Sequence, residues 1–282
     1  MLHRYWIIAV VLFFGEAWAQ DKNDPLRLVT FLAGTLPVIL LAPHGGREAI
    51  PGIPVRRGHQ VAQFTTERDS NTAESAEQVG AMLAIELGAR PFLVVARFER
   101  KYIDANRAPA AAYESPAAKL YYDGYHQALG EACRRVRQRW GHGLLLDLHG
   151  QGAEPETIFR GTDNGKSVSD LERRFGQGAF TGGGSILGQL VLKGYKIAPD
   201  GGANDLERKY SGGFTTRTYG SYRNTGIDAI QLELGTRLRQ RANLKRTAAD
   251  LAEAIAVFAK RYLPLTGRST EVQDGAQPQL ER

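Results

Sequence analysis

The chain has 282 residues, of which 43% are hydrophobic and 23% are charged, as in an ordinary globular protein. This composition excludes a fibrous or low-complexity protein, and about 260 residues are enough to bury the core of one α/β domain. The net charge of +6 favours anionic small molecules, and we expect no nucleic-acid partner because the basic runs lack interleaved aromatic residues.

The N-terminus has the features of a signal peptide. His3 and Arg4 precede an apolar run over residues 5–15, and residues 17–19 (Ala-Trp-Ala) form the small-x-small pattern of a cleavage site. The apolar run is shorter than the ~20 residues that a membrane-spanning helix needs. We therefore expect cleavage after Ala19 and an exported protein, periplasmic or extracellular, with no membrane span in the mature chain.

The hydrophobic pattern changes repeatedly between strand-like and helix-like periods. Strands are predicted over residues 36–42, 91–96, 143–148, 157–160, 213–216 and 228–234. Helices are predicted over residues 71–87, 116–140, 185–194 and 247–262. Because two of the strands show little polar alternation, helices should cover both faces of the sheet. We predict a three-layer α/β/α sandwich with a central mixed, mostly parallel sheet, formed by a single domain over residues 20–265 and followed by a flexible tail, 266–282.

Two histidines follow strands in similar contexts. His44 stands in Pro-His-Gly-Gly after the first strand, and His149 stands in Asp-Leu-His-Gly after the third. Ligands of open α/β sheets bind at the carboxyl ends of strands. Since Cys133 is the single cysteine, a metal must be held by histidine and carboxylate side chains. We predict one Zn²⁺ per chain on His44 and His149, with Asp147 on the same strand face orienting an imidazole.

Two acidic residues compete as the third ligand, and the spacing leaves the choice open. One is Glu48, four residues after His44, and the other is Asp69. A further carboxylate, Glu233, stands late in a predicted strand on the same side as Gln231, where an acidic side chain is costly to bury unless it is paired or functional. Beside a zinc-bound water it would act as the general base, passing a proton from the water to the leaving nitrogen.

Two segments contain arginines suited to binding a substrate carboxylate through the planar guanidinium group. The first covers residues 97–107 and the second covers residues 212–220. Together with the net positive charge, they predict a small acidic amide or peptide as the partner of the site.

In their order along the chain, these motifs resemble the N-formylglutamate amidohydrolase family of the zinc carboxypeptidase-like (phosphorylase/hydrolase-like) superfamily. The matching blocks are residues 43–46, the region around Asp69, residues 100–107, 147–150, 212–220 and 231–233. The resemblance spans about residues 38–235. Each block is weak alone, but six blocks in this order are specific for the superfamily.

The resemblance implies roles for individual residues. It implies that His44 and His149 are zinc ligands, that Asp69 is their acidic partner, and that Glu233 is the catalytic carboxylate. It also implies a set of substrate-binding residues: Arg100, Asn106, Arg107 and Arg217. The related poly-γ-glutamate hydrolases place a glutamate ligand shortly after a His-Gly-Gly motif, and the sequence HGGRE at residues 44–48 is similar to it. This similarity favours Glu48 as the third ligand and leaves Asp69 to bind substrate or metal.

We therefore predict a zinc-dependent amidohydrolase that cleaves an amide of an acidic N-acyl amino acid similar to N-formylglutamate, or a γ-glutamyl bond. One alternative is an exported hydrolase of the same fold that acts on a peptide, poly-γ-glutamate or a cell-wall amide. Another is a non-catalytic protein that binds a metal or an anion. N-formylglutamate arises in cytoplasmic histidine breakdown, so the predicted export argues for a different acidic substrate. The sequence does not define the oligomeric state.

Overall fold

The computed structural model describes residues 25–59, 61–200 and 205–267. The predicted signal peptide, residues 1–19, and most of the predicted tail lie outside these ranges. A search of the described helices found none with the length and apolar character that a bilayer crossing requires.

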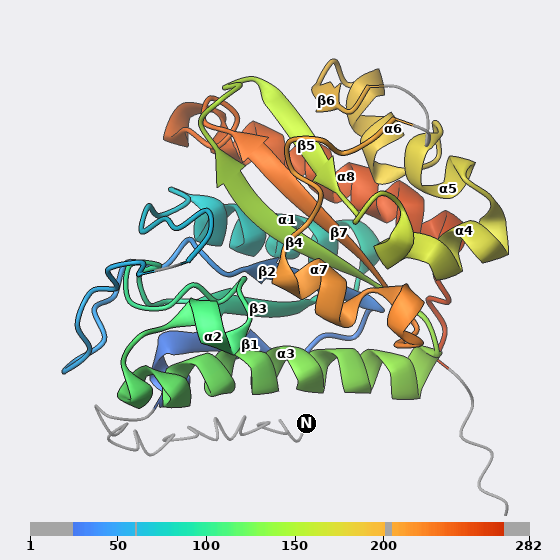
Figure 1. The fold of residues 1–282 in the computed structure, drawn as a ribbon. Coiled ribbons are helices and arrows are strands. Elements are labelled where there is room, and N and C mark those ends of the chain that lie inside the picture. The colour runs from blue at the N-terminus through green and yellow to red at the C-terminus, as the bar shows by residue number, and fades with distance from the viewer. Residues whose placement is uncertain (1–24, 60, 201–204, 268–282) are drawn as a thin grey trace, which may run out of the picture.

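A seven-stranded mixed sheet forms the centre of the molecule (Figure 1). Its strands are β1 (Val29–Leu32), β2 (Val38–Ala42), β3 (Phe92–Ala96), β4 (Gly143–Gln151), β5 (Thr157–Gly161), β6 (Lys196–Ala198) and β7 (Ile227–Gly235), in the order β1-β3-β2-β4-β7-β5-β6. β3, β2, β4 and β7 run parallel to one another, as do β5 and β6. β1 is antiparallel to β3, and β5 is antiparallel to β7. The predicted mixed, mostly parallel sheet is confirmed.

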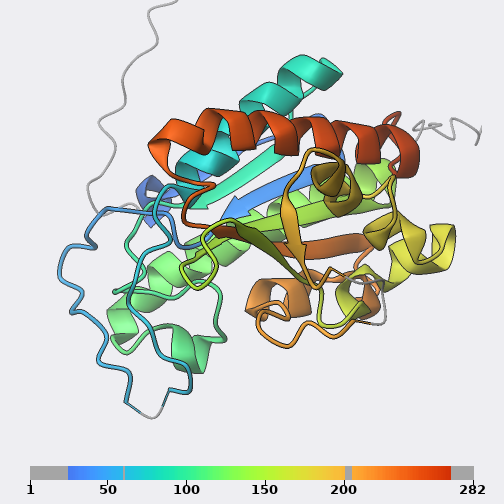
Figure 2. The same ribbon diagram turned by 90° about the horizontal axis from the view of Figure 1, so that it is seen from above.

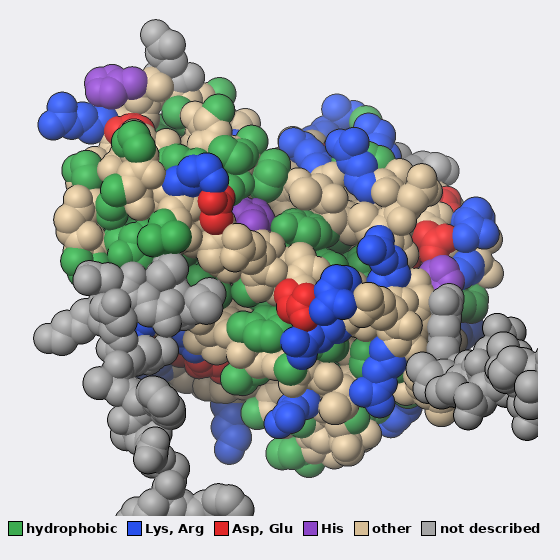
Figure 3. Space-filling model, turned by 90° about the horizontal axis from the view of Figure 1, so that it is seen from below, with side chains coloured by type: hydrophobic (Ala, Val, Ile, Leu, Met, Phe, Trp, Pro, Cys, Tyr) green, Lys and Arg blue, Asp and Glu red, His purple; other side chains and the backbone are tan. Residues whose placement is uncertain are grey.

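Helices cover both faces of this sheet (Figures 1 and 2). Helices α1 (Thr72–Leu87) and α8 (Arg241–Tyr262) pack together over one face, and α3 (Lys119–Trp140) covers the other. The shorter helices are α2 (Pro109–Ala112), α4 (Ser169–Phe175), α5 (Gly178–Thr181), α6 (Ile186–Leu192) and α7 (Phe214–Tyr219). Seen from the side shown in Figure 3, many Lys and Arg side chains lie on the surface of the molecule. Because helices cover both faces of the sheet, the predicted three-layer sandwich is confirmed.

Alternation along the central strands divides the buried side chains between two cores. Leu144, Leu146 and Leu148 of β4 belong to the core under α1 and α8, whereas Leu145 belongs to the core under α3. On the α3 side, the strand continues from Leu145 to Asp147 and His149, so its character changes from apolar to polar. The carboxyl end of this face is therefore available for a polar site.

β7 changes in the same way beside β4. Its residue Ala229 faces the α3 core, and Gln231 and Glu233 follow at the same two-residue spacing. The parallel register pairs Asp147 with Gln231 and His149 with Glu233. Paired residues on neighbouring strands project to the same face, so two central strands together present four polar side chains at one edge.

The predicted strand over residues 213–216 is wrong, because α7 occupies this segment. The side chain of Asn106 accepts a hydrogen bond from the Thr215 N–H, and Gln231 accepts one from the Gly213 N–H. These partners satisfy N–H groups that a helix start leaves without intrahelical acceptors. A tertiary contact thus outweighs the strand preference of the threonines in this segment. β1 and β6 were not predicted; both are short and lie at the two edges of the sheet.

Candidate active site

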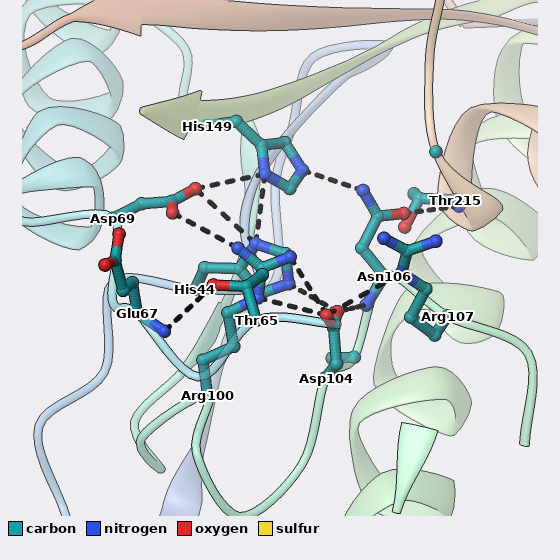
Figure 4. Close-up of polar contacts among 12 residues, drawn as sticks. His44, Thr65, Glu67, Asp69, Arg100, Asp104, Asn106, Arg107, His149 and Thr215 are labelled. Atoms are coloured by element: carbon teal, nitrogen blue, oxygen red, sulfur yellow. Dashed lines mark hydrogen bonds and ion pairs between the residues drawn. The ribbon is translucent and has the colours of Figure 1, made fainter. Parts of the chain in front are cut away.

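His44, Asp69 and His149 form a buried cluster at the carboxyl end of the central strands (Figure 4). His44 follows β2, His149 lies in β4, and Asp69 lies in the loop before α1. The two Nδ1 atoms are 3.1 Å apart, and Asp69 Oδ2 lies 3.2 Å from Nδ1 of His149 and 3.4 Å from Nδ1 of His44. Three potential ligand atoms therefore form a nearly equilateral triangle.

This triangle fits a metal ion by its chemistry and its size. Two imidazole nitrogens and one carboxylate oxygen are a typical ligand set of catalytic zinc sites. With metal–ligand distances of about 2.0–2.1 Å, the ligand atoms of a tetrahedral site lie about 3.3 Å apart, close to the separations found here. The cluster could therefore hold a metal ion on three protein ligands.

The outer nitrogen of each imidazole faces a further buried carboxylate. His44 Nε2 lies 2.7 Å from Asp104 Oδ1, and His149 Nε2 lies 3.2 Å from Asp147 Oδ2. In metal sites such carboxylates fix the ring orientation and raise the basicity of the ligand. The sequence predicts a carboxylate beside the imidazole only at Asp147, and Asp104, which lies inside the 100–107 block expected to bind substrate, was not predicted.

The charges of the cluster are strongly coupled. Burial by itself raises the pKa of Asp69, but the contacts with His149 and His44 outweigh burial and hold the pKa well below its ordinary value. Burial lowers the pKa of His149, whereas Asp147 and Asp69 raise it well above its ordinary value. For Asp104, the neighbouring His44 and Arg100 overcome the effect of burial and lower the pKa. Three buried carboxylates thus surround two imidazoles, an environment that favours a cation.

The structure does not bring Glu48 into this cluster. Its side chain is about half exposed and lies 3.8 Å from the guanidinium of Arg27. The cause is local, since the backbone of Glu48 bonds to Arg97 and Glu99 beside the end of β3. The structure therefore groups Asp69, rather than Glu48, with the two histidines.

Glu233 lies next to His149 on the neighbouring strand and is also buried. Its Oε1 accepts a hydrogen bond of 2.8 Å from Nε2 of Gln231. Burial raises the pKa of the Glu233 carboxyl, and the charges of His149 and Asp69 act on it in opposite directions. A buried carboxylate with a raised pKa beside a potential metal site is suited to accepting a proton.

Of the expected substrate-binding residues, Arg100 and Asn106 already bind other site residues. Arg100 Nε donates to Asp104 Oδ2 at 3.0 Å, and its Nη1 lies 3.5 Å from Asp69 Oδ1. Asn106 is buried, with its Nδ2 3.0 Å from Nε2 of His149 and its Oδ1 accepting from the Thr215 N–H. Both side chains hold the site together in this structure.

The other two candidates are more accessible. Arg107 is about one-third exposed and donates to the backbone carbonyl of Gln63. Arg217 is about half exposed and lies 3.5 Å from Asp163. Arg107 Nε also lies 3.8 Å from Oδ2 of Asp104, the carboxylate that contacts His44.

Comparisons with known proteins identify a family and relatives that this chain resembles. The family model for N-formylglutamate amidohydrolase matches residues 112–239. The resemblance to the N-formylglutamate amidohydrolase family is therefore confirmed. The chain is 25% identical over 277 residues to the N-formylglutamate deformylase of Pseudomonas putida, covering 84% of this chain and 94% of the relative.

Two solved structures have a similar fold. The N-formylglutamate amidohydrolase of Ralstonia eutropha superposes with a TM-score of 0.56 at 19% identity, covering 83% of this chain and 98% of the other. A gene product of Agrobacterium tumefaciens superposes with a TM-score of 0.51 at 16% identity, covering 83% and 92%. The names of the amidohydrolase and deformylase relatives support the predicted class, a hydrolase of amide bonds.

The prediction of an exported protein is wrong. Characterised relatives of this kind are cytoplasmic enzymes. The segment that suggested export, residues 1–19, lies outside the described residues. The argument from export against a substrate similar to N-formylglutamate therefore loses its basis.

Proposed function

We propose that this protein is a zinc-dependent amidohydrolase that removes the acyl group from an acidic N-acyl amino acid such as N-formylglutamate. The observation that carries the proposal is the triangle formed by Nδ1 of His44, Nδ1 of His149 and Oδ2 of Asp69, with Glu233 on the adjacent strand. The relatives named for this reaction match most of the chain, which supports the substrate class.

His44, Asp69 and His149 would hold the zinc ion. When bound, zinc supplies Lewis-acid polarisation of the amide carbonyl and of a water molecule. Asp104 holds the His44 ring by its outer nitrogen, whereas the outer nitrogen of His149 lies 3.0 Å from Asn106 Nδ2 and 3.2 Å from Asp147 Oδ2. These contacts at the outer nitrogens would keep both Nδ1 atoms directed at the cluster.

Glu233 is proposed to move the proton. As a water oxygen attacks the carbonyl carbon, the Glu233 carboxylate takes a proton from that water and then donates it to the leaving amide nitrogen. The hydrogen bond from Gln231 fixes one carboxylate oxygen, Oε1, and leaves the other for this transfer. The raised pKa makes Glu233 a stronger base than an exposed glutamate.

Arg107 and Arg217 are proposed to bind the carboxylates of the substrate. Both side chains are exposed enough to meet a ligand, whereas Arg100 is already paired with Asp104. A guanidinium group binds a carboxylate through two parallel hydrogen bonds. An N-acyl amino acid with an acidic side chain presents two carboxylates, so it should be preferred over one with an apolar side chain.

A hydrolysis assay tests the proposal. The zinc-loaded protein is given N-formyl-L-glutamate, and N-formyl-L-leucine serves as the matched substrate without a side-chain carboxylate. We expect release of formate from the first substrate with a kcat/KM at least tenfold higher than from the second. Absence of hydrolysis of both by the zinc-loaded protein would contradict the proposed reaction, and equal hydrolysis would contradict the preference for acidic substrates.

A further inference from the structure

Arg239 is a buried cation that does not lie against a carboxylate. Its side chain is 7% exposed, in the turn between β7 and α8. Within the described part of the chain, no carboxylate oxygen lies within 4.0 Å of its guanidinium. Burial outweighs the favourable charges of Asp69 and Glu233 and lowers the pKa of Arg239, so this placement is costly and calls for a specific explanation. Arg237, which lies two residues earlier in the sequence, is in contrast exposed and pairs with Glu156.

The guanidinium instead donates to three backbone carbonyls from three segments. Nη1 donates to Ser70 O at 2.6 Å, Nη2 to Gln151 O at 3.3 Å, and Nε to Leu234 O at 3.1 Å. Ser70 follows Asp69, Leu234 follows Glu233, and Gln151 lies two residues after His149. Each acceptor therefore belongs to a segment that carries one of the site residues.

Gly150 makes room for this arrangement. A Cβ atom at Gly150 would lie 2.5 Å from Nε and 2.6 Å from Cζ of Arg239. The backbone N–H of Gly150 donates to Asp69 Oδ2 at 3.0 Å. Since Gly150 follows His149 in a strand, its missing side chain faces the opposite side of the sheet. The guanidinium therefore lies behind the cluster.

We infer that Arg239 is a positioning residue of the site, an inference that rests on the proposed function. Its guanidinium fixes the loop before α1 and the ends of β4 and β7 relative to one another, which sets the spacing of Asp69, His149 and Glu233. A planar guanidinium carries donors in several fixed directions, whereas the single ammonium nitrogen of lysine cannot reach three separated carbonyls in the same way. Charge alone is thus insufficient at this position.

The test uses Arg239→Lys and Gly150→Ala as two independent ways of disturbing the contact. Arg237→Lys is the matched control on an exposed arginine. Ser185→Ala, which removes the cap that accepts from the Gly188 N–H at the start of α6, controls for lost stability. Zinc affinity is measured by competition with a chromophoric chelator, and kcat and KM are measured separately at a temperature where all variants are folded.

We expect both site variants to bind zinc at least tenfold more weakly and to lose at least tenfold in kcat, with KM changed less than threefold. The zinc affinity and kcat of the double variant should be no lower than those of the more impaired single variant, because both changes break the same contact. The two controls should behave as the wild-type protein. Wild-type zinc affinity and kcat in folded Arg239→Lys and in folded Gly150→Ala would overturn the inference.

Amide hydrogen exchange on the zinc-free protein separates this inference from the proposed function. Arg239→Lys should exchange at least tenfold faster around residues 70 and 151, with α3 unchanged. A wild-type protein that neither binds zinc nor hydrolyses the substrate would overturn the proposed function. Unchanged exchange around residues 70 and 151 in Arg239→Lys would overturn the role of Arg239 in either case.

Discussion

His44 and His149 are 105 positions apart in the sequence, yet their Nδ1 atoms face each other at 3.1 Å. The parallel pairing of β2 with β4 produces this contact, because it places the carboxyl ends of both strands at one edge of the sheet. Two imidazole nitrogens so close together, with Asp69 Oδ2 beside both, form a site that a cation can stabilise.

The third ligand is tested by Asp69→Asn and Glu48→Gln. We expect Asp69→Asn to weaken zinc binding at least 100-fold, since the amide carries no charge and is a poorer ligand than the carboxylate. Glu48→Gln should bind zinc as the wild-type protein does, because its side chain is half exposed beside Arg27. Isothermal titration of the zinc-free proteins measures both affinities. The reverse result would identify Glu48 as the ligand.

Asp104 should act through His44. Asp104→Asn removes the carboxylate from His44 Nε2, and loss of such an orienting partner typically costs about 10–100-fold in metal affinity. Glu99→Gln is the matched control, because Glu99 pairs with Lys101. Competition with a chelator measures the zinc affinity of both variants. Equal zinc affinity in Asp104→Asn and the wild-type protein would refute this role.

Glu233→Gln should separate metal binding from catalysis. The amide cannot accept the proton from water, so we expect kcat to fall by about 10²–10⁴-fold, the usual range for a general base. Zinc content should remain that of the wild-type protein, since Glu233 is not among the cluster ligands. Glu156→Gln, at an exposed glutamate paired with Arg237, is the control. A Glu233→Gln protein that retains zinc and full activity would refute the assigned mechanism.

Asp228 predicts a pH dependence of stability. Burial raises its pKa to about 6, although Arg174 and the Leu171 N–H donate to its carboxylate. Between pH values of about 4 and 6 the folded state holds a proton that the unfolded chain has lost. The stability that protonated Asp228 contributes is therefore fully present below a pH of about 4 and is lost as the pH rises through about 6.

Asp228→Asn lacks this titration and keeps an oxygen that accepts from Leu171. Relative to the wild-type protein, the variant should gain about 2 kcal/mol in the free energy of unfolding between pH 4 and pH 7, since one pKa unit corresponds to about 1.4 kcal/mol. Urea denaturation of both proteins at several pH values measures this difference. Parallel pH profiles would show that the pKa of Asp228 is not raised.

Much of the frame of the site follows from local sequence patterns. The long apolar runs before His44 and His149 predict buried parallel strands, and the two-residue alternation places Gln231 and Glu233 on one face. The choice between Glu48 and Asp69 did not follow, because both lie in a long irregular segment without a repeating period. Only the folded loop shows that Asp69, and not Glu48, reaches the histidines.

The other features that the sequence does not predict depend on contacts between distant segments. Asp104 looked like one charged residue among many in the 100–107 block, and its role depends on the approach of His44. Arg239 stands in a basic run whose neighbour Arg237 is exposed, so its burial is not evident from composition. The start of α7 depends on acceptors from Asn106 and Gln231, which a local propensity cannot reveal.

The most direct test is the metal content of the purified protein, measured by elemental analysis without added metal or chelator. The wild-type protein should contain close to one zinc ion per chain. His149→Ala, which removes one corner of the triangle, should contain little or none. A wild-type protein that binds no zinc, even after reconstitution with the ion, would contradict the assignment of His44, Asp69 and His149 as a catalytic metal site.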